Sequence, residues 1–467
     1  MSDTTSFVER TVARLRRTWR EIALRAEGVP PRPELPADDS ARLRAQLRAC
    51  LDAAGGEVSA RARAAALGRS YLALDKAGRE RFLRLLADEF SADRRAVDAA
   101  IARVQGAPSE GERWAAERAL RGALEPPRVR LLTRFNALDE GVKFLVDMRA
   151  ELLGLARGKD GGALGELEAD LKDLLAAWFD IGFLELRRIT WNAPAAVLEK
   201  LAAYEAVHAV KSWQDLKNRL DSDRRCFAFF HPNLPDEPLI FVEVALVGGM
   251  ADNVQSLLDE AAPSGDPRGA DAAIFYSISN AQRGLAGISF GAFLIKRVVE
   301  SLQAEFPNLK IFATLSPIPG FRRWLDERLD DASLEPKEWT ALASCGMPVG
   351  AAALKHVLAD GSWIGNMRLA AALKVPIMRL CARYLIEARR PQGGTLDPVA
   401  HFHLSNGARM ERLNWLGDRS EKGLRESAGV MINYLYRLDD IETNHEAYVT
   451  QRRIAASAAM HGLSTAT

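Results

Sequence analysis

The chain has 467 residues, of which 48% are hydrophobic and 27% charged, which is the balance of a globular protein. This length exceeds what one ordinary hydrophobic core supports, so we expect at least two domains. Lysine and arginine total 63 against 62 for aspartate and glutamate, and no basic stripe with interleaved aromatic residues occurs, so we expect no nucleic-acid partner.

The cysteines and the N-terminal segment indicate in which cellular compartment the protein is expected. The four cysteines lie far apart and form no C-x-x-C pair, which argues against a disulfide framework and a structural zinc site. The N-terminal segment is Arg-rich and amphipathic, so a transit peptide is an alternative, but Glu9, Glu21 and Glu27 fit one poorly. No apolar run of about 18 residues predicts a membrane span. We therefore expect a cytoplasmic protein with reduced cysteines and no membrane partner.

The first domain, residues 1–190, is predicted to be an all-helical bundle. It is rich in Ala, Arg, Leu and Glu, and its apolar residues recur at helical spacing, as Phe82, Leu85 and Phe90 do in "RERFLRLLADEF". It contains no recognisable catalytic arrangement. We expect it to support the rest of the chain or to form oligomer contacts.

Strand patterns follow in residues 191–467. Two apolar runs at 226–230 and 239–246, separated by a turn rich in Pro, Asn and Asp, predict a hairpin. "DAAIFYSIS" predicts a third strand, and residues 309–315 a fourth. Between them, the apolar pattern from Ile288 onward predicts a helix. The order strand, Gly-rich turn, helix, strand predicts that the last two strands are parallel.

The Gly-rich stretch "GLAGISFGAFL" contains the G-x-S-x-G spelling of a serine hydrolase around Ser289. A nucleophile elbow needs its serine on the sharp turn directly after a strand, whereas Ser289 is predicted inside the first helical turns, so we do not expect a nucleophile there. Small residues at a helix start also leave backbone N–H groups open to phosphate, although such glycines often serve only tight packing.

Longer motifs carry a resemblance. "FYSISNAQRGLAGISFGAFLIKRVVESLQAEFPNLKIFATLSPIPGF", "HFHLSNGARMERLNWLGDRS" and "INYLYRL" closely resemble the malonyl-CoA decarboxylase family. The resemblance implies an α+β fold, in which an N-terminal all-helical bundle precedes a GNAT-like mixed α/β catalytic domain at residues 191–467. It also implies that the Gly-rich stretch holds the CoA pyrophosphate and acyl arm. The implied substrate-binding residues are Gly284, Ala286, Gly287, Ile288, Ser289, Phe290, Gly291 and Ala292.

The resemblance assigns catalysis to Ser316, His403 and Tyr436. Ser316 precedes a proline, which holds it extended at the end of a predicted parallel strand, where α/β sheets open ligand crevices; a plain strand-terminating turn is the alternative. Tyr436 lines the same site in the family, and a packed aromatic is its alternative.

The histidine assignment rests on "VAHFHLSNGA". Alternation predicts a strand with Val399, His401 and His403 on one face. Histidines at i and i+2 could suggest a metal site, but no nearby cysteine or carboxylate completes a ligand set, so we expect no metal. His403 matches the family's catalytic position, and His401 is expected to be structural.

The implied reaction is decarboxylation of malonyl-CoA to acetyl-CoA and CO₂. The thioester carbonyl accepts the charge left on carbon, so no cofactor is needed as an electron sink. His403 is the expected proton donor, with Ser316 as its partner, because an imidazole with an ordinary pKa of about 6.5 is suited to that role at neutral pH. The alternatives are a CoA-dependent acyltransferase and a non-catalytic CoA-binding or assembly protein. The resemblance also implies a homo-oligomer formed through the helical domain.

Overall fold

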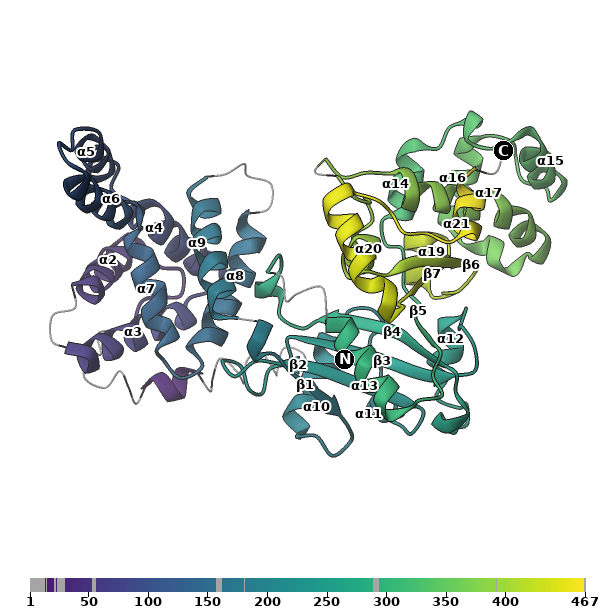
Figure 1. The fold of residues 1–467 in the computed structure, drawn as a ribbon, viewed down its shortest axis with the longest axis horizontal. Helices are drawn as coiled ribbons and strands as arrows, with labels where there is room; N and C mark the ends of the chain where they lie inside the picture. The colour runs from purple at the N-terminus through teal and green to yellow at the C-terminus, as the bar shows by residue number, and fades with distance from the viewer. Residues whose placement is uncertain are drawn as a thin grey trace. The chain divides into compact units, whose positions relative to one another are not determined.

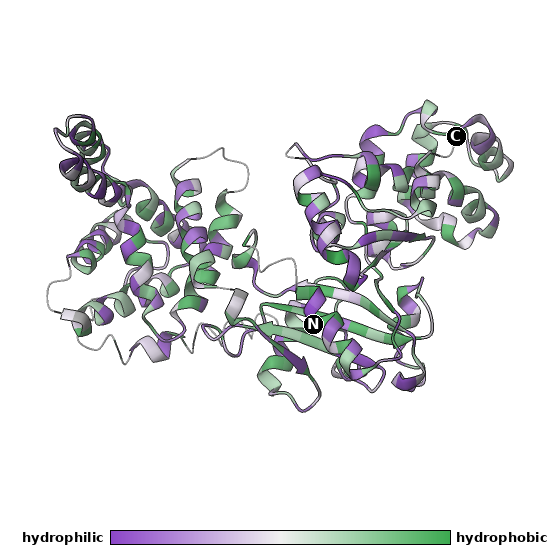
Figure 2. Ribbon diagram, in the orientation of Figure 1, coloured by the Kyte–Doolittle hydropathy of each residue, from purple (hydrophilic) through white to green (hydrophobic). Residues whose placement is uncertain are grey.

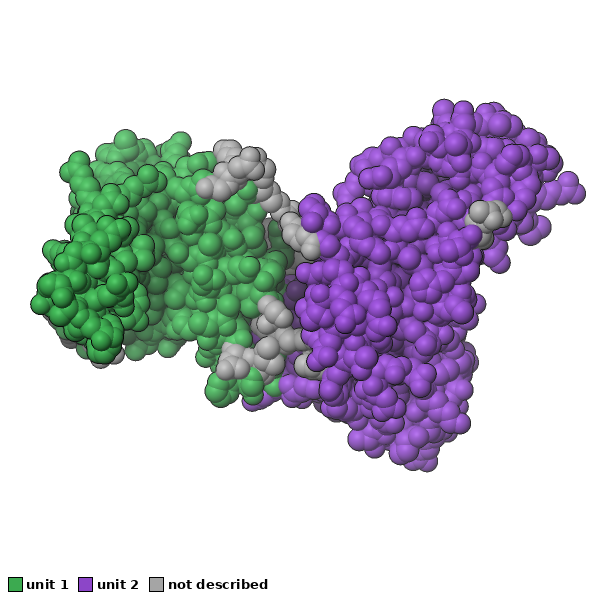
Figure 3. Space-filling view, turned by 45° about the horizontal axis from the view of Figure 1, so that its top comes forward, with its two compact units in different colours: residues 1–184, 231–237, 282–289 green, residues 185–230, 238–281, 290–467 purple. Residues whose placement is uncertain are grey.

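The chain folds into two compact units, coloured separately in Figure 3. Unit 1 comprises residues 1–184, 231–237 and 282–289, and unit 2 comprises residues 185–230, 238–281 and 290–467. This computed structural model describes residues 13, 15–20, 22, 30–52, 56–156, 162–179, 181–288, 294–391 and 393–465. Two short segments that lie beyond residue 190, 231–237 and 282–289, therefore belong to the helical unit.

Unit 1 is helical (Figure 1). Its helices are α2 (Ala37–Leu51), α3 (Gly56–Ala73), α4 (Lys76–Glu89), α5 (Arg94–Gln105), α6 (Glu110–Leu124), α7 (Pro127–Asn136), α8 (Gly141–Ala156) and α9 (Ala163–Trp178), with the 3₁₀ turns η1 (Ile181–Phe183) and η3 (Arg283–Leu285). Several begin at a capping side chain: Asp75 accepts from the N–H of Gly78 at the start of α4. The predicted helical spacing is confirmed, because Phe82, Leu85 and Phe90 are all buried.

Unit 2 is built on one mixed sheet. Its described strands are β1 (Glu185–Ile189), β2 (Arg224–Phe230), β3 (Ile240–Val247), β4 (Ala272–Asn280), β5 (Ile311–Thr314), β6 (Arg409–Asn414) and β7 (Met431–Leu435), in the order β1-β2-β3-β4-β5-β7-β6. The β2–β3 pair is antiparallel and the β4–β5 pair parallel, which confirms the predicted hairpin and the predicted parallel pair. In Figure 2 the strands β2 and β3 are largely coloured as hydrophobic, and every residue of β2 is buried.

The remaining helices belong to unit 2. They are α10 (Ala195–Tyr204), α11 (Trp213–Asn218), α12 (Val254–Leu257), α13 (Leu294–Glu305), α14 (Phe321–Arg328), α15 (Pro336–Ser344), α16 (Ala351–Asp360), α17 (Met367–Glu387), α18 (Pro398–Ser405), α19 (Glu421–Ser427), α20 (Leu438–Gln451) and α21 (Ala458–Thr465), with 3₁₀ turns at Pro267–Gly269, Asp331–Ser333 and Ser362–Gly365. The predicted α+β class, a helical region followed by a mixed sheet domain, is confirmed. None of the helices in the described residues is both long enough and apolar enough to cross a bilayer.

Three local predictions are wrong. The sheet begins at Glu185, before the expected end of the helical region, because β1 pairs with β2. Ile288 lies outside any helix, and the described part of α13 begins at Leu294. Val399, His401 and His403 lie on α18 and not on a strand. The Asp397 carboxylate accepts from the N–H groups of Val399 and Ala400, and Pro398 occupies the first helical position, so capping overrides the alternation.

Candidate active site

The site forms where β4 and β5 separate. The two strands pair in parallel as far as Phe275 and Thr314, after which the peptide groups of Ser316 exchange hydrogen bonds of 2.8 and 3.0 Å with those of Ile432 in β7. Ser316 therefore turns toward β7 and leaves the end of β4 without a strand partner on that edge among the described residues. The opening lies at the carboxyl end of a parallel strand, where α/β sheets bind ligands.

The short helix α18 carries His403 to this opening. Asp397 caps its first turn, and His403 lies in its last turn, 3% exposed. The chain leaves α18 through Gly407, whose φ of +79° and whose position beside Ile441 exclude a side chain: an added Cβ would lie 2.1 Å from the Ile441 carbonyl oxygen. This contact explains the glycine of the His-Leu-x-Asn-Gly-Ala motif.

Hydrogen bonds join the three predicted catalytic side chains into one line. Ser316 Oγ lies 3.1 Å from His403 Nε2, and His403 Nδ1 lies 2.8 Å from the Tyr436 hydroxyl. Thr314 extends the line, because Ser316 O–H donates to Thr314 Oγ1 at 2.8 Å, and the backbone N–H of Tyr434 donates to the same oxygen at 3.1 Å. Thus β5, α18 and the end of β7 each supply part of the network.

Burial sets the charge of this network. Loss of water contact lowers the pKa of His403 to about 3, so the imidazole is neutral at neutral pH. This value corrects the expectation of an ordinary histidine. Burial also raises the pKa of Tyr436 well above its usual range, which keeps its phenol protonated. The ring of Tyr434 stacks on the imidazole with 4.4 Å between centroids and fixes its plane.

A cavity of about 230 Å³ in unit 2 adjoins Ser316 and His403. Most of its wall is apolar. The lining residues are Val207, Ile240, Phe275, Tyr276, Ile278, Asn280, Ser316, Pro317, Pro398, Val399, Phe402 and His403. A register shift between β3 and β4 at Glu243 and Val244 makes Tyr276 an extra residue in β4, and such bulges redirect side chains beside functional sites.

The predicted substrate-binding stretch is described only in part. Ser289, Phe290, Gly291 and Ala292 lie outside the described residues. Gly284, Ala286, Gly287 and Ile288 lie in unit 1, in and after the turn η3. The N–H groups of Ala286 and Ile288 donate to Arg283 and Leu285 within the loop, whereas the N–H of Gly287 has no partner among the described residues.

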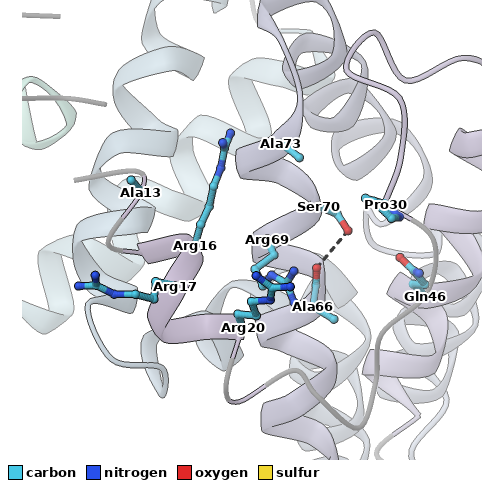
Figure 4. A pocket seen from close by; sticks show the side chains of 10 residues that line it. All are labelled: Ala13, Arg16, Arg17, Arg20, Pro30, Gln46, Ala66, Arg69, Ser70 and Ala73. Atoms are coloured by element: carbon cyan, nitrogen blue, oxygen red, sulfur yellow. Dashed lines mark hydrogen bonds between the residues drawn. The ribbon is translucent and has the colours of Figure 1, made fainter. Parts of the chain in front are cut away.

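Other candidates lie apart from this network. His401 Nδ1 lies 2.7 Å from the Tyr448 hydroxyl and does not contact Ser316. In the described residues, no three His, Cys, Asp or Glu side chains gather as a metal site would require. A second cavity, of about 670 Å³, lies in unit 1 (Figure 4), and the described residues of its wall include no histidine, cysteine or carboxylate. That wall consists of Ala13, Arg16, Arg17, Arg20, Pro30, Gln46, Ala66, Arg69, Ser70 and Ala73.

Thr314 is a member of the network that no motif in the sequence predicted. Its hydroxyl touches Ser316 because residues i and i+2 of an extended chain point to the same side. That spacing is visible in "TLS", but serine and threonine are common at strand ends, and the pattern alone does not indicate a shared hydrogen bond.

A neutral imidazole held between two hydroxyl groups at an apolar pocket is an arrangement of the kind that enzymes use for acid–base chemistry. The chain belongs to the malonyl-CoA decarboxylase family, as its motifs suggested. The family model "Malonyl-CoA decarboxylase C-terminal domain" matches residues 182–466, and "Malonyl-CoA decarboxylase N-terminal domain" matches residues 90–179.

Relatives extend over most of the chain. The mitochondrial malonyl-CoA decarboxylase of Rattus norvegicus is 44% identical over 355 residues, which cover 73% of this chain and 72% of the rat protein. That of Anser anser anser is 40% identical over 412 residues, which cover 85% of this chain and 82% of the goose protein. The crystal structure of malonyl-CoA decarboxylase from Rhodopseudomonas palustris has 42% identity and a TM-score of 0.81, and the match covers 90% of this chain and 98% of that one.

Proposed function

We propose that the chain converts malonyl-CoA to acetyl-CoA and CO₂ with His403 as the proton donor and Ser316 as its partner. The observation that carries this proposal is the 3.1 Å contact between Ser316 Oγ and His403 Nε2 beside a cavity that both side chains line. The mainly apolar wall suits an acyl thioester, and the cavity lies where β4 offers unpaired peptide groups.

The reaction breaks the bond between the carboxylate carbon and the α-carbon of the malonyl group. The bonding electrons pass to the thioester as an enolate, so the chemistry needs no resident electron sink. Carbon dioxide leaves, and the α-carbon must then receive one proton. The protein's task is to hold the thioester in place and to deliver that proton.

The direction of the hydrogen bonds indicates how the proton is held. Ser316 O–H donates to Thr314, so its oxygen is left to accept from His403 Nε2–H. Tyr436 O–H then donates to His403 Nδ1 and fixes this tautomer of the neutral ring. The ring takes up one proton from solvent when the malonyl carboxylate binds beside it, because a nearby negative charge favours the imidazolium form. Ser316 then gives its hydroxyl proton to the enolate carbon and takes the Nε2 proton of His403, so the ring returns to its neutral state and Tyr436 stays protonated throughout.

We assign the CoA phosphates to the loop that contains Gly284, Ala286, Gly287 and Ile288, continuing through the four residues that follow it. The free N–H of Gly287 supports this assignment, since a backbone N–H without a partner is a donor for phosphate oxygen.

Assembly and location belong to the proposal as well. A homo-oligomer formed through unit 1 is supported by apolar side chains on α5 and α6: Ile101 is 39% exposed, Trp114 59% and Leu124 53%. Light scattering of the wild-type protein and of Trp114→Glu tests this, and an unchanged mass in the variant would contradict it. The four free cysteines support a reducing cytoplasm, which fractionation of the native cells tests.

The decisive experiment is incubation of the purified protein with malonyl-CoA and no added cofactor, with CO₂ and acetyl-CoA measured. We expect both products in equal amounts. Ser316→Ala and His403→Ala should each lower kcat by about 100-fold or more while CoA still binds in calorimetry. Ser289→Ala should keep substantial activity. An acyl product without CO₂ would indicate an acyltransferase, and CoA binding without turnover would indicate a non-catalytic protein; either result overturns the proposal.

A further inference from the structure

The loop assigned to the CoA phosphates is packed against the helical unit. Gly284 lies on α8, where an added Cβ would be 1.7 Å from the carbonyl oxygen of Val146, so only glycine fits there. Leu285 beside it is fully buried. Residues 282–289 accordingly belong to unit 1, although the strand before them and the helix after them belong to unit 2 (Figure 3).

A buried arginine of α8 holds this loop. Arg149 is 1% exposed and donates from Nη1 to the carbonyl of Gly284 and from Nη2 to that of Ala286 at 2.9 Å. Glu168 of α9 fixes the same guanidinium through contacts of 3.0 Å to Nε and 2.6 Å to Nη2. Because a guanidinium is a rigid fork, two helices set the positions of both carbonyls at once.

A second cation of the helical unit, Lys172, lies close to Gly287 of the loop. Gly287 has a φ of +75° and is exposed, and a Cβ placed on it would lie 4.0 Å from Nζ of Lys172 on α9. Lys172 has no carboxylate partner within ion-pair distance among the described residues. Its ammonium therefore lies close to Gly287, whose N–H has no partner among the described residues.

We propose that Lys172 binds a phosphate of the CoA moiety together with the Gly287 N–H, and that Arg149 is a positioning residue that holds the loop for this contact. The proposal rests on the proposed function. It gives the helical unit a direct part in substrate binding, beyond support and assembly. A charged donor and a backbone donor close together are suited to binding a phosphate oxygen, and they are not expected to contact the acyl group.

The test compares two substrates, malonyl-CoA and malonyl-pantetheine, which lacks the phosphates and the adenosine. Lys172→Ala should raise KM for malonyl-CoA by about tenfold or more, with kcat kept, and leave both constants for malonyl-pantetheine unchanged. Lys172→Arg should recover most of the loss. Lys355→Ala, at a half-buried lysine of α16, is the matched control and should change neither substrate's KM.

Arg149→Lys should also raise KM for malonyl-CoA selectively, with its thermal unfolding followed to establish that it folds. If it does not fold, Lys172→Ala alone decides. An equal change with both substrates, or an unchanged KM for malonyl-CoA in Lys172→Ala, overturns the proposal. Calorimetry with CoA separates this outcome from failure of the proposed function, because Lys172→Ala should weaken CoA binding about tenfold even in a protein that releases no CO₂.

Discussion

The neutral state of His403 predicts a pH dependence of stability. In the unfolded chain a histidine has a pKa of about 6.5 and is about nine-tenths protonated at about pH 5.5. In the folded protein burial lowers the pKa of His403 to about 3, so it stays neutral at that pH. The unfolded state then binds more protons, and stability falls as the pH falls below about 6.5. The full contribution is present above that pH and is lost toward pH 3.

The size of this loss of stability can be worked out at about pH 5.5, which lies about one unit below the pKa of a histidine in the unfolded chain. Between about pH 7.5 and pH 5.5, His403 should lower the free energy of unfolding by about 1.4 kcal/mol. Urea denaturation gives the free energy of unfolding of the wild type and of His403→Gln at both pH values. The contribution of His403 is the change between the two pH values in the wild type minus the same change in the variant, because the contributions of all other groups are common to both proteins.

The control is His461→Gln, at an exposed histidine of α21, which tests for an effect of the substitution itself. Equal pH changes in the wild type and His403→Gln would refute the reasoning that burial keeps His403 neutral.

Two further predictions concern the Ser–His network and the turn after α18. Thr314→Val should lower kcat about tenfold at unchanged KM, because Ser316 loses its fixed acceptor, and Thr314→Ser should restore most of it; steady-state kinetics measures both, and equal losses would contradict a hydroxyl role. Gly407→Ala should lower the free energy of unfolding by about 2–4 kcal/mol, since its Cβ meets the Ile441 carbonyl. Gly122→Ala, in an open position of α6, should instead raise it by about 0.5–1 kcal/mol, and urea denaturation that showed similar changes in both would contradict the steric argument.

The strand prediction at residues 399–404 shows how two local signals can conflict. Period-two alternation favoured a strand, but the Asp397-Pro398 pair is a helix start, with a capping carboxylate followed by a proline that needs no N–H partner. The alternation spans too few residues to outweigh the cap. The Asp-Pro pair is therefore the stronger local signal, and it indicates a helix.

Local sequence patterns could not predict contacts between residues that lie far apart in the sequence. Residues 185–189 form β1 because they pair with β2, which lies more than thirty residues later in the chain. Gly284 was open to a phosphate role or a packing role, and the carbonyl of Val146 shows the packing. Thr314 joins the network because β5 separates from β4 only after it.

The sequence by itself determined the helical first part, the hairpin, the parallel strand pair and, through long motifs, the family, and the same motifs singled out Ser316, His403 and Tyr436 as candidates. Periodicity and motifs are properties of short segments, so they can be recognised from the sequence alone. The tertiary structure alone decided that these three side chains form one hydrogen-bonded line, that the imidazole in it is neutral, and that an arginine of the helical unit holds the loop. Hydrogen-bond distance and exclusion of water depend on how segments far apart in the chain pack, and no spacing in the sequence records that.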